Sequence, residues 1–535
     1  MAQLARPAAT LALLRDAPGG PEVLMLQRTP SAAFLGGAYV FPGGSLDTAD
    51  TDPRLVARVR NLPSENPSIA YWVAAIRESF EEAGILLACD EDGQLVAAER
   101  AARLAHYRSK PFIELLEDED LYIPAGELAY VGHWVTAPKR PRRFDTRFFV
   151  ALTPEGQEGS HDAGETVDAL WISPRKALER GARGEIELVY ATQHTLNELK
   201  SFATATEAMR YVRGLKEIEE NRACLAIGKE GEKIFRRSDP QYHEIHWSDP
   251  EETGTTTYDI VAGESKRLDR WVTRLTASNP GMMTGPGTNT YIVGSDNARA
   301  VIDPGPDIAT HIENILRFAN IRWILCTHTH MDHSPAAAAI KAATGAQVLG
   351  RPAPAGQDAT FKPDFIVENG QRIDLGEIAL RAIHTPGHAS NHLCYLLEET
   401  RMLFTGDHVM QGSTVVINPP DGDMRAYLQS LERLIDEEIA IIAPGHGYLI
   451  GAPKKELRRL IAHRLAREEK VVSALVKIGP ASVDELLPLV YDDVPARIHR
   501  VAARSLTAHL EKLSADGAVR CAGERYALVK SRSAG

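Results

Sequence analysis

The sequence predicts a multidomain protein of the α/β and α+β classes, and three observations support this fold class. The chain has 535 residues, which suggests three or four domains at a typical size of about 150 residues per domain. Short apolar runs alternate with helical patterns in two separate regions, and three helical patterns with a terminal hairpin follow them. We therefore expect domains at 1–205, 266–450 and 451–535, with a connector at 206–265.

In the first domain, strands are predicted where β-favouring apolar residues lie between turn residues, at 10–16, 22–28, 126–136, 147–153 and 169–173. One long helical pattern, 68–88, has apolar residues at helical spacing, including Trp72, Ile76 and Phe80. The stretch SDPQYHEIHWSDPEETGTTT is polar, rich in turn residues and aperiodic, so we expect it to lie in the connector.

The central region shows a second set of strand patterns, at 289–294, 298–305, 322–330, 346–350, 401–407 and 440–447, with helical patterns at 308–320 and 424–438. Each strand pattern ends in a turn rich in Gly, Asp or His, and α/β folds place their chemistry at such turns. Helical patterns at 455–476, 483–491 and 497–517 and a hairpin at 518–529 then resemble a winged helix-turn-helix.

Charge is unevenly distributed along the chain. The formal net charge is −12, which argues against nucleic-acid binding by most of the protein. Residues 454–535 carry 16 Lys and Arg against 10 Asp and Glu, a net of +6, and Arg464 and Arg467 are among them. Arg497, Arg500 and Arg504 share one face of the predicted recognition helix, which indicates an RNA partner. The alternative is a helical cap that packs on the hydrolase or mediates dimerisation; the oligomeric state is not indicated.

Cysteine usage and hydropathy indicate the compartment. The five cysteines are widely spaced and include no CxxC pair, which is typical of a reducing environment. No stretch approaches 18 uninterrupted apolar residues, and the first apolar run is interrupted at Arg15, so neither a transmembrane helix nor a signal peptide is expected. We expect a cytoplasmic protein with no membrane partner.

The strongest chemical signal is THTHMDHS at 327–334, which places three histidines and an aspartate within six positions. Further ligand types follow in HTPGH, FTGDH and APGHG. Imidazole and carboxylate groups together suit borderline cations such as zinc. Seven such groups on loops at strand ends can hold two metals with one carboxylate shared, and a metal pair makes a strong nucleophile at neutral pH.

On these residues the segment 268–450, which includes the DPG at 303–305, resembles the metallo-β-lactamase superfamily and its αβ/βα sandwich. The resemblance implies one Zn²⁺ held by His328, His330 and His388. It implies a second held by Asp332, His333 and His446, with Asp407 bridging and Asp332 also catalytic, because it orients the nucleophile.

The sequence NPGMMTGPGTNTYIVG at 279–294, together with the tail, resembles the lactamase-beta-like branch of that superfamily. The branch includes thioesterases and an endoribonuclease that acts on single-stranded RNA. The resemblance therefore implies dinuclear-zinc hydrolysis of an ester, a thioester or a phosphodiester, with a single-stranded RNA endonuclease as the alternative.

A second metal signature lies on the long helical pattern of the first domain. In RESFEEAGI, Glu78, Glu81 and Glu82 lie at i, i+3 and i+4 and share one helical face. Like charges at this spacing repel, so the cluster is explained by Mg²⁺ or Mn²⁺, which prefer carboxylate oxygens. The alternative is an acidic helix face exposed to solvent.

FPGG at 41–44 and RESFEEAGI together resemble the box of the Nudix hydrolases, which implies an α/β/α sandwich with Glu78, Glu81 and Glu82 as metal ligands and Glu82 as a catalytic residue. This sequence departs from the box by a 19-residue insertion between Gly44 and Arg77, and Asp50 stands where the box has Glu. The surrounding residues resemble a long-insert branch that includes acyl-coenzyme-A diphosphatases. That resemblance implies a nucleoside-diphosphate-linked or CoA-like substrate; alternatively, this domain is a non-catalytic nucleotide-binding regulator.

Overall fold

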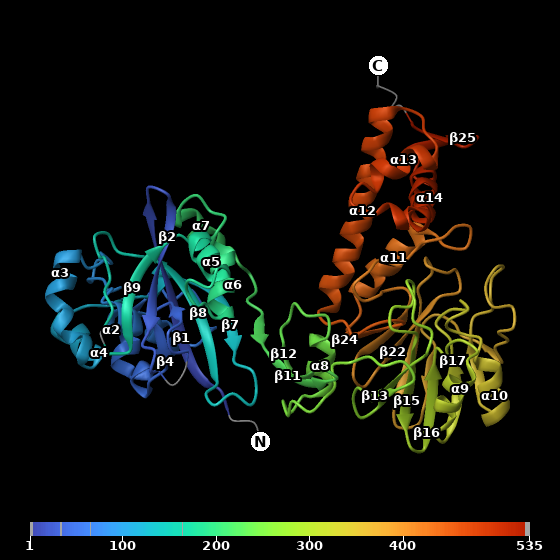
Figure 1. Ribbon diagram of the computed structural model, residues 1–535, viewed down its shortest axis with the longest axis horizontal. Helices are drawn as coiled ribbons and strands as arrows, with labels where there is room; N and C mark the ends of the chain where they lie inside the picture. Colours follow the sequence, from blue (N-terminus) through green and yellow to red (C-terminus); the bar gives the residue numbers. More distant parts are fainter. Residues whose placement is uncertain (1–3, 33–34, 65, 163, 530–535) are drawn as a thin grey trace. The chain divides into compact units, whose positions relative to one another are not determined.

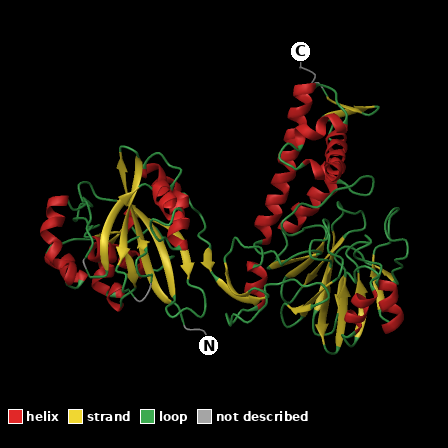
Figure 2. Cartoon of the chain, in the orientation of Figure 1, coloured by secondary structure: helices red, strands yellow, loops and turns green. Residues whose placement is uncertain are grey.

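The computed structural model describes residues 4–32, 35–64, 66–162 and 164–529. Residues 1–3 of the predicted first domain and 530–535 of the predicted last domain therefore lie outside the described residues. Figures 1 and 2 show the course of the chain and its helices and strands. The chain divides into two compact units, Met1–Leu225 with Glu251–Gly254, and Ala226–Pro250 with Thr255–Gly535. Each unit is described separately.

The described part of the first unit is built on an eight-stranded sheet with the order β10-β7-β8-β1-β2-β3, in which β4 also pairs with β1 and β9 with β2. β1 (Arg6–Ala17) lies antiparallel to β2 (Gly20–Arg28) and parallel to β8 (Phe144–Leu152). The other strands are β3 (Tyr39–Val40), β4 (Gly43–Ser45), β7 (Leu128–Val135), β9 (Thr166–Ile172) and β10 (Glu220–Arg222).

Helices cover both faces of this sheet, because successive side chains of a strand point to opposite faces. Leu11 and Leu13 of β1 pack in the cluster that contains α2 (Ile69–Ala83). Ala12 and Leu14 pack in the opposite cluster, with α5 (Pro174–Ala182), α6 (Tyr190–Leu199) and α7 (Ala205–Arg213). The α/β/α layering expected from the sequence is confirmed.

The helix α2 forms where the sequence predicted a helix. Trp72, Ile76 and Phe80 recur every four residues and are all buried on the sheet. The helix ends at Gly84, whose φ of 67° is a left-handed conformation that glycine adopts without a steric penalty. The insertion before α2 is folded into η1 (Thr48–Thr51), α1 (Pro53–Ala57) and β5 (Val59–Arg60). The elements after it are α3 (Ala98–Arg103), η2 (Leu104–Ser109), α4 (Phe112–Asp118), β6 (Ile123–Pro124) and η3 (Ala125–Glu127).

The stretch 206–265, for which we predicted an irregular connector, contains regular structure. The helix α7 and the strand β10 belong to the first unit. A hairpin of β11 (Cys224–Gly228) and β12 (Gly231–Phe235) follows, and then α8 (Tyr242–Ser248). Glu244 of α8 is buried, and because a buried charged residue looks like a surface residue in a hydropathy pattern, that helix was not predicted.

Two sheets pack face to face in the second unit. One has the order β13-β14-β15-β16-β17-β18-β19 and the other the order β20-β21-β22-β23-β24. The strands of the first are β13 (Ser265–Arg267), β14 (Val272–Thr276), β15 (Asn289–Ser295), β16 (Ala298–Ile302), β17 (Ile321–Leu325), β18 (Gln347–Gly350) and β19 (Phe365–Ile366). Those of the second are β20 (Arg372–Asp374), β21 (Ala379–His384), β22 (Leu393–Leu397), β23 (Met402–Gly406) and β24 (Ile441–Pro444).

Alternating side chains again explain the layers of this unit. Val293 of β15 and Ala382 of β21 lie in the cluster between the sheets. Ile292 faces α9 (Ala309–Leu316) and α10 (Ala337–Thr344) on one outer side. Ile383 faces α11 (Met424–Ile435) on the other. The unit is therefore an αβ/βα sandwich, as the sequence resemblance implied.

The tail consists of α12 (Pro453–Ile478), α13 (Val483–Val490), the short turn η4 (Ala496–Ile498), α14 (His499–Ala515) and a hairpin of β25 (Val519–Ala522) and β26 (Arg525–Leu528). It has its own apolar cluster, and Leu457 and Leu460 of α12 and Ala508 of α14 also pack in the cluster around α11. The expected helices and hairpin are confirmed. Among the described residues, no helix combines the length and apolarity needed to span a bilayer.

Candidate metal centres

The seven predicted zinc ligands lie at the ends of four strands of the second unit. His328, His330, Asp332 and His333 follow β17, and His388, Asp407 and His446 follow β21, β23 and β24 respectively. The fold gathers them into two groups, within each of which the ligand atoms lie within 4.8 Å of one another: His328, His330 and His388 in one, and Asp332, His333, Asp407 and His446 in the other.

Asp407 faces both groups. Its Oδ1 lies 3.3 Å from His446 Nε2 and 3.5 Å from His333 Nε2. Its Oδ2 lies 3.9 Å from His388 Nε2, in the other group. Asp332 lies at the more exposed side of the second group, with its Oδ2 3.3 Å from His446 Nε2. One carboxylate is thus in place to serve two cations.

Buried atoms without hydrogen-bond partners show that these residues fit a metal. Among the described residues, the Nε2 atoms of His328, His333 and His446 and the Oδ1 of Asp407 are buried and make no hydrogen bond. A buried polar atom without a partner is costly. Imidazole nitrogens and carboxylate oxygens converging in this way are the donors that a divalent cation of zinc type prefers.

Hydrogen bonds at the opposite ring nitrogens orient the histidines. His388 Nδ1 lies 2.8 Å from the carbonyl of Val416, and His446 Nδ1 lies 3.2 Å from that of Gly287. His333 Nδ1 lies 2.9 Å from Asp303 Oδ2. A carbonyl or carboxylate only accepts, so each ring donates from Nδ1 and leaves Nε2 as the atom that can bind a metal.

The two groups differ in their electrostatics. Burial lowers the pKa of His330 to about 4, with help from the neighbouring His388. Burial also lowers the pKa of His446, but Asp407 and Asp332 outweigh it and raise that pKa to about 9. The first group is therefore neutral at pH 7, whereas the second pairs cationic imidazole with carboxylate until a cation replaces the protons.

The three predicted carboxylates of the first unit lie on α2, but their oxygens do not converge as the histidine groups do. Arg77 Nη1 lies 2.8 Å from both Glu78 and Glu81. Glu82 instead accepts a hydrogen bond from the backbone NH of Gly43 at 2.9 Å. In the described residues, the only groups of metal-site dimensions are the two that contain histidine.

Burial changes the acidity of these glutamates. It raises the pKa of Glu78 to about 7, although Arg77 opposes the shift, and it raises the pKa of Glu82 to about 8. Glu82 is buried and Glu78 and Glu81 are partly buried, so the three carboxylates are costly to ionise together, and divalent cations would remove that cost. The donor set fits Mg²⁺ or Mn²⁺.

The predicted basic face of the tail is exposed. Arg500 and Arg504 lie on α14, while Arg497 lies in the preceding turn η4, and the side chains of all three are open to solvent. Arg464 and Arg467, which contributed to the basic charge of the tail, are instead buried. The charge available to an external partner is therefore smaller than the sequence count indicated.

Comparison with known proteins matches three parts of the chain to family models. Residues 283–446 match the model of the metallo-beta-lactamase superfamily, residues 53–195 that of the NUDT19 Nudix domain, and residues 482–526 that of the beta-lactamase associated winged helix domain. Lactamase-like protein adaB of Aspergillus niger is 31% identical over 282 residues, which cover 49% of this chain and 86% of that protein. The chain belongs to the metallo-beta-lactamase superfamily.

Two further similarities concern one half of the chain each. The Thioesterase pkgB of Emericella nidulans is 32% identical over 240 residues, 44% of this chain and 67% of that protein. A NUDIX hydrolase crystal structure from Alicyclobacillus acidocaldarius is 33% identical, covers 39% of this chain and 96% of that chain, and has a TM-score of 0.35. The three family models place a Nudix domain before the metallo-beta-lactamase superfamily domain and a winged helix after it, and both enzyme domains are of hydrolase families.

Two residues that support the lactamase site were given no role in the sequence analysis. Asp303 accepts hydrogen bonds from Thr327 NH at 2.7 Å, Thr327 Oγ1 at 2.8 Å and His333 Nδ1. Gly445 lies so close to the ligands that a Cβ there would be 2.7 Å from Asp407 Oδ1 and 2.8 Å from His333 Cε1. The DPG and PGHG motifs that carry these residues were the available signal.

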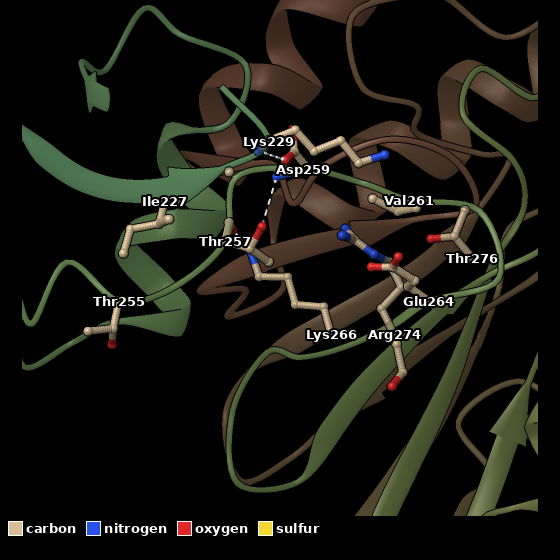
Figure 3. Close-up of a pocket in the computed structure, with 12 residues that line it drawn as sticks. Ile227, Lys229, Thr255, Thr257, Asp259, Val261, Glu264, Lys266, Arg274 and Thr276 are labelled. Atoms are coloured by element: carbon tan, nitrogen blue, oxygen red, sulfur yellow. Dashed lines mark hydrogen bonds between the residues drawn. The ribbon is translucent and has the colours of Figure 1, made fainter. Parts of the chain in front are cut away.

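A pocket of 430 Å³ lies elsewhere in this unit, at the end of the β11–β12 hairpin (Figure 3). Its inner wall contains Lys266 and Arg274, which both contact Glu244 of α8, at 2.9 Å and at 3.0 Å respectively. At its rim the backbone NH of Lys229 donates to Asp259 at 2.7 Å. The charges of its lining nearly cancel, so the pocket indicates no particular ligand.

Proposed function

We propose that this chain is a bifunctional hydrolase whose lactamase domain holds two Zn²⁺ ions and cleaves an ester or thioester. The observation that carries the proposal is the position of Asp407, which faces both groups of predicted ligands. When bound, the metal pair would supply a nucleophile at neutral pH and polarise the scissile carbonyl. The similarity to a protein named as a thioesterase supports this reaction class.

Side chains at the rim of the centre support an apolar substrate. Met331 lies between His330 and Asp332 and is 64% exposed. Met282 and Met283 are also exposed, in the turn just before Gly287, whose carbonyl accepts from His446. Exposed methionines are adaptable apolar contacts, so they suit the acyl part of an ester. Asp332, which follows Met331 in the chain, would orient the attacking water.

We further propose that the Nudix domain cleaves a nucleoside-diphosphate-linked or CoA-like substrate with Mg²⁺ or Mn²⁺. Glu78, Glu81 and Glu82 would hold the metal, which screens the charge of the diphosphate. With its pKa raised to about 8 by burial, Glu82 is suited to accept a proton from water near neutral pH. If the domain is only a nucleotide-binding regulator, it binds nucleotides without turnover.

One experiment tests both activities, with each variant as the control for the other. Wild type, Glu82→Gln and Asp332→Asn are assayed on acyl-CoA, nucleotide sugars, dinucleotides, a thioester and single-stranded RNA. We expect Asp332→Asn to lose thioester hydrolysis by about 100-fold and to retain diphosphate cleavage, with the reverse for Glu82→Gln. Turnover that survives in both variants would contradict the proposed sites.

Cleavage of single-stranded RNA is the second candidate for the lactamase domain, and the exposed Arg497, Arg500 and Arg504 favour it. Phosphate contacts make nucleic-acid affinity fall steeply with salt. Replacing the three arginines with glutamine should then lower the rate of RNA cleavage and make that rate less sensitive to salt. Thioester hydrolysis should be unchanged. Equal RNA cleavage by the variant and the wild type would exclude this tail face as an RNA interface.

The domain organisation stays a prediction, which we propose as 1–205, 206–265, 266–450 and 451–535 with the functions given above. We also propose a cytoplasmic location. Four of the five cysteines are buried and all five are free thiols, which supports a reducing compartment.

A further inference from the structure

A single backbone carbonyl accepts a hydrogen bond from the His388 ring, at the ring nitrogen that does not face the first ligand group. His388 Nδ1 donates to Val416 O at 2.8 Å, while its Nε2 faces His330 Nδ1 at 3.0 Å within the first ligand group. This hydrogen bond selects the tautomer with a free lone pair on Nε2 and fixes the plane of the ring. The position of the Val416 carbonyl therefore determines whether His388 is ready to bind a metal.

The segment that carries Val416 has no regular structure of its own. Residues 407–423 form neither helix nor strand between β23 and α11. Without a ladder of backbone hydrogen bonds, contacts from other elements must hold this carbonyl in place. The flanking Val415 and Ile417 are buried in one apolar cluster with Leu457 and Leu460 of α12.

Both neighbours of Val416 are hydrogen-bonded to the C-terminal tail. The guanidinium of Arg464, on α12, donates to the carbonyl of Val415. The backbone NH of Ile417 donates to Ser505 Oγ, on α14, at 3.4 Å. Arg464 and Ser505 are 3% and 6% exposed. The tail thus anchors the chain on each side of the carbonyl that orients His388.

Apolar packing alone does not explain why an arginine stands at the buried position 464. Its guanidinium carbon lies 5.3 Å from the centre of the Tyr427 ring, and among the described residues it forms no ion pair with a carboxylate. A buried cation in such a place is costly relative to an apolar side chain. Arg467, three residues further along, is equally buried but pairs with Asp493 at 2.7 Å inside the tail.

We propose that Arg464 is a positioning residue for the metal centre, and that the winged-helix tail thereby completes the lactamase site. Arg464 holds Val415, the neighbouring Val416 carbonyl then stays where His388 Nδ1 can donate to it, and His388 Nε2 is directed at the first ligand group. The inference rests on the proposed metal centre. It gives the tail a function that needs no nucleic acid.

The test measures Zn²⁺ affinity of the full-length protein by competition with a chromophoric chelator. Wild type is compared with Arg464→Met, which keeps the apolar stem but removes the donor, and with the control Arg467→Met. We expect Arg464→Met to bind one of two Zn²⁺ ions about 10-fold more weakly, a loss typical of removing a partner that orients a metal ligand. Arg467→Met should bind both ions as the wild type does, and Arg464→Lys should restore part of the affinity.

Each outcome decides the inference. Equal Zn²⁺ affinity in Arg464→Met and the wild type overturns it and leaves the proposed function intact, whereas a wild type that binds no Zn²⁺ overturns both. Equal weakening in Arg467→Met also overturns it, because the effect is then general loss of tail packing. If Arg464→Met does not fold, Ser505→Ala keeps the arginine and carries the test, with an expected loss of about 3-fold; no loss overturns the inference.

Discussion

Arg77 and Asp50 form a buried, two-point ion pair beside the predicted metal-binding glutamates of the Nudix domain. Arg77 Nε lies 2.8 Å from Asp50 Oδ1, and its Nη2 lies 3.0 Å from Asp50 Oδ2. Asp50 is fully buried. The remaining donor, Nη1, contacts Glu78 and Glu81. By fixing the guanidinium, Asp50 fixes the direction of two of the three predicted metal ligands.

We expect Asp50→Asn to damage both the stability and the chemistry of the first unit. The change removes one of three carboxylate partners of the buried Arg77 and leaves Glu78 and Glu81 in place, which should cost about 1–3 kcal/mol. Magnesium-dependent diphosphate cleavage should fall by at least about 10-fold, because Glu78 and Glu81 lose their orientation. Thermal unfolding and an assay of diphosphate cleavage measure the two effects, and Asp50→Glu should recover part of the activity.

The control is Asp52→Asn, two residues away. Asp52 pairs at 2.8 Å with Arg54, whose side chain is 58% exposed. Exposed pairs contribute little to stability, so this change should leave both the free energy of unfolding and the activity close to those of the wild type. If Asp50→Asn behaves in the same way as Asp52→Asn, the pair with Arg77 has no role in orienting the glutamates.

The Asp50–Arg77 pair also shows where sequence reasoning reached its limit. Asp50 stands where the Nudix box has Glu, but 19 inserted residues separate Gly44 from Arg77 beyond the spacing of the box. The inserted chain folds into α1 and β5 and returns, so Asp50 still meets Arg77. The spacing of two residues along the chain does not show that they come into contact when the residues inserted between them fold as a separate segment.

Other features of the structure also divide into those that the sequence could predict and those that it could not. The strand-end histidines could be predicted, because the ends of neighbouring strands meet at one edge of a sheet and the residue types are specific to metals. Glu244 and Arg464 could not, since a buried charge looks like a surface charge until its partners are known. The net charge of the tail overstated the charge available to an external partner, because Arg464 and Arg467 contribute to it but are buried.

We expect Asp303→Asn to weaken metal binding by the second ligand group, although the substitution replaces no predicted metal ligand. The carboxylate accepts from His333 Nδ1 and from Thr327, and one amide oxygen cannot replace all three contacts. His333 then loses the partner that fixes its tautomer, and Zn²⁺ affinity should fall about 10-fold. Metal titration of the purified protein measures this effect; full affinity in Asp303→Asn would show that His333 is oriented by other contacts.

Gly445→Ala should prevent the second ligand group from assembling. The added Cβ would lie 2.7 Å from Asp407 Oδ1 and 2.8 Å from His333 Cε1, closer than van der Waals contact permits. We expect loss of one Zn²⁺ ion and of lactamase-domain activity, with diphosphate cleavage by the Nudix domain retained as the internal control. The matched change Gly19→Ala, at a glycine of the first unit whose φ is not positive and whose Cβ position has no atom within 4 Å, should leave metal content unchanged.

The last prediction concerns acid stability of the second unit, through Glu244. Burial alone would raise the pKa of Glu244, but Arg274 and Lys266 outweigh it and hold that pKa below its ordinary value of 4.5. A carboxyl whose pKa is lower in the folded protein stabilises the fold above its unfolded pKa, and this contribution is lost as the pH falls through the folded pKa. The contribution of Glu244 should therefore be complete at pH 6–7 and decline below about pH 4.5.

Glu244→Gln tests this directly. At pH 7 it leaves Arg274 and Lys266 buried without a carboxylate, which should cost the second unit about 3–5 kcal/mol. As the pH falls below 4.5 the difference from the wild type should shrink, because the unfolded wild-type chain then binds a proton at this carboxyl that the folded protein does not yet bind. Glu252→Gln, which removes a partner of Arg143 and Arg222 in the first unit, is the control and should leave the unfolding of the second unit unchanged. Calorimetry over this pH range measures both variants, and a Glu244→Gln difference that stays constant with pH would mean that the ionisation of Glu244 does not stabilise the fold.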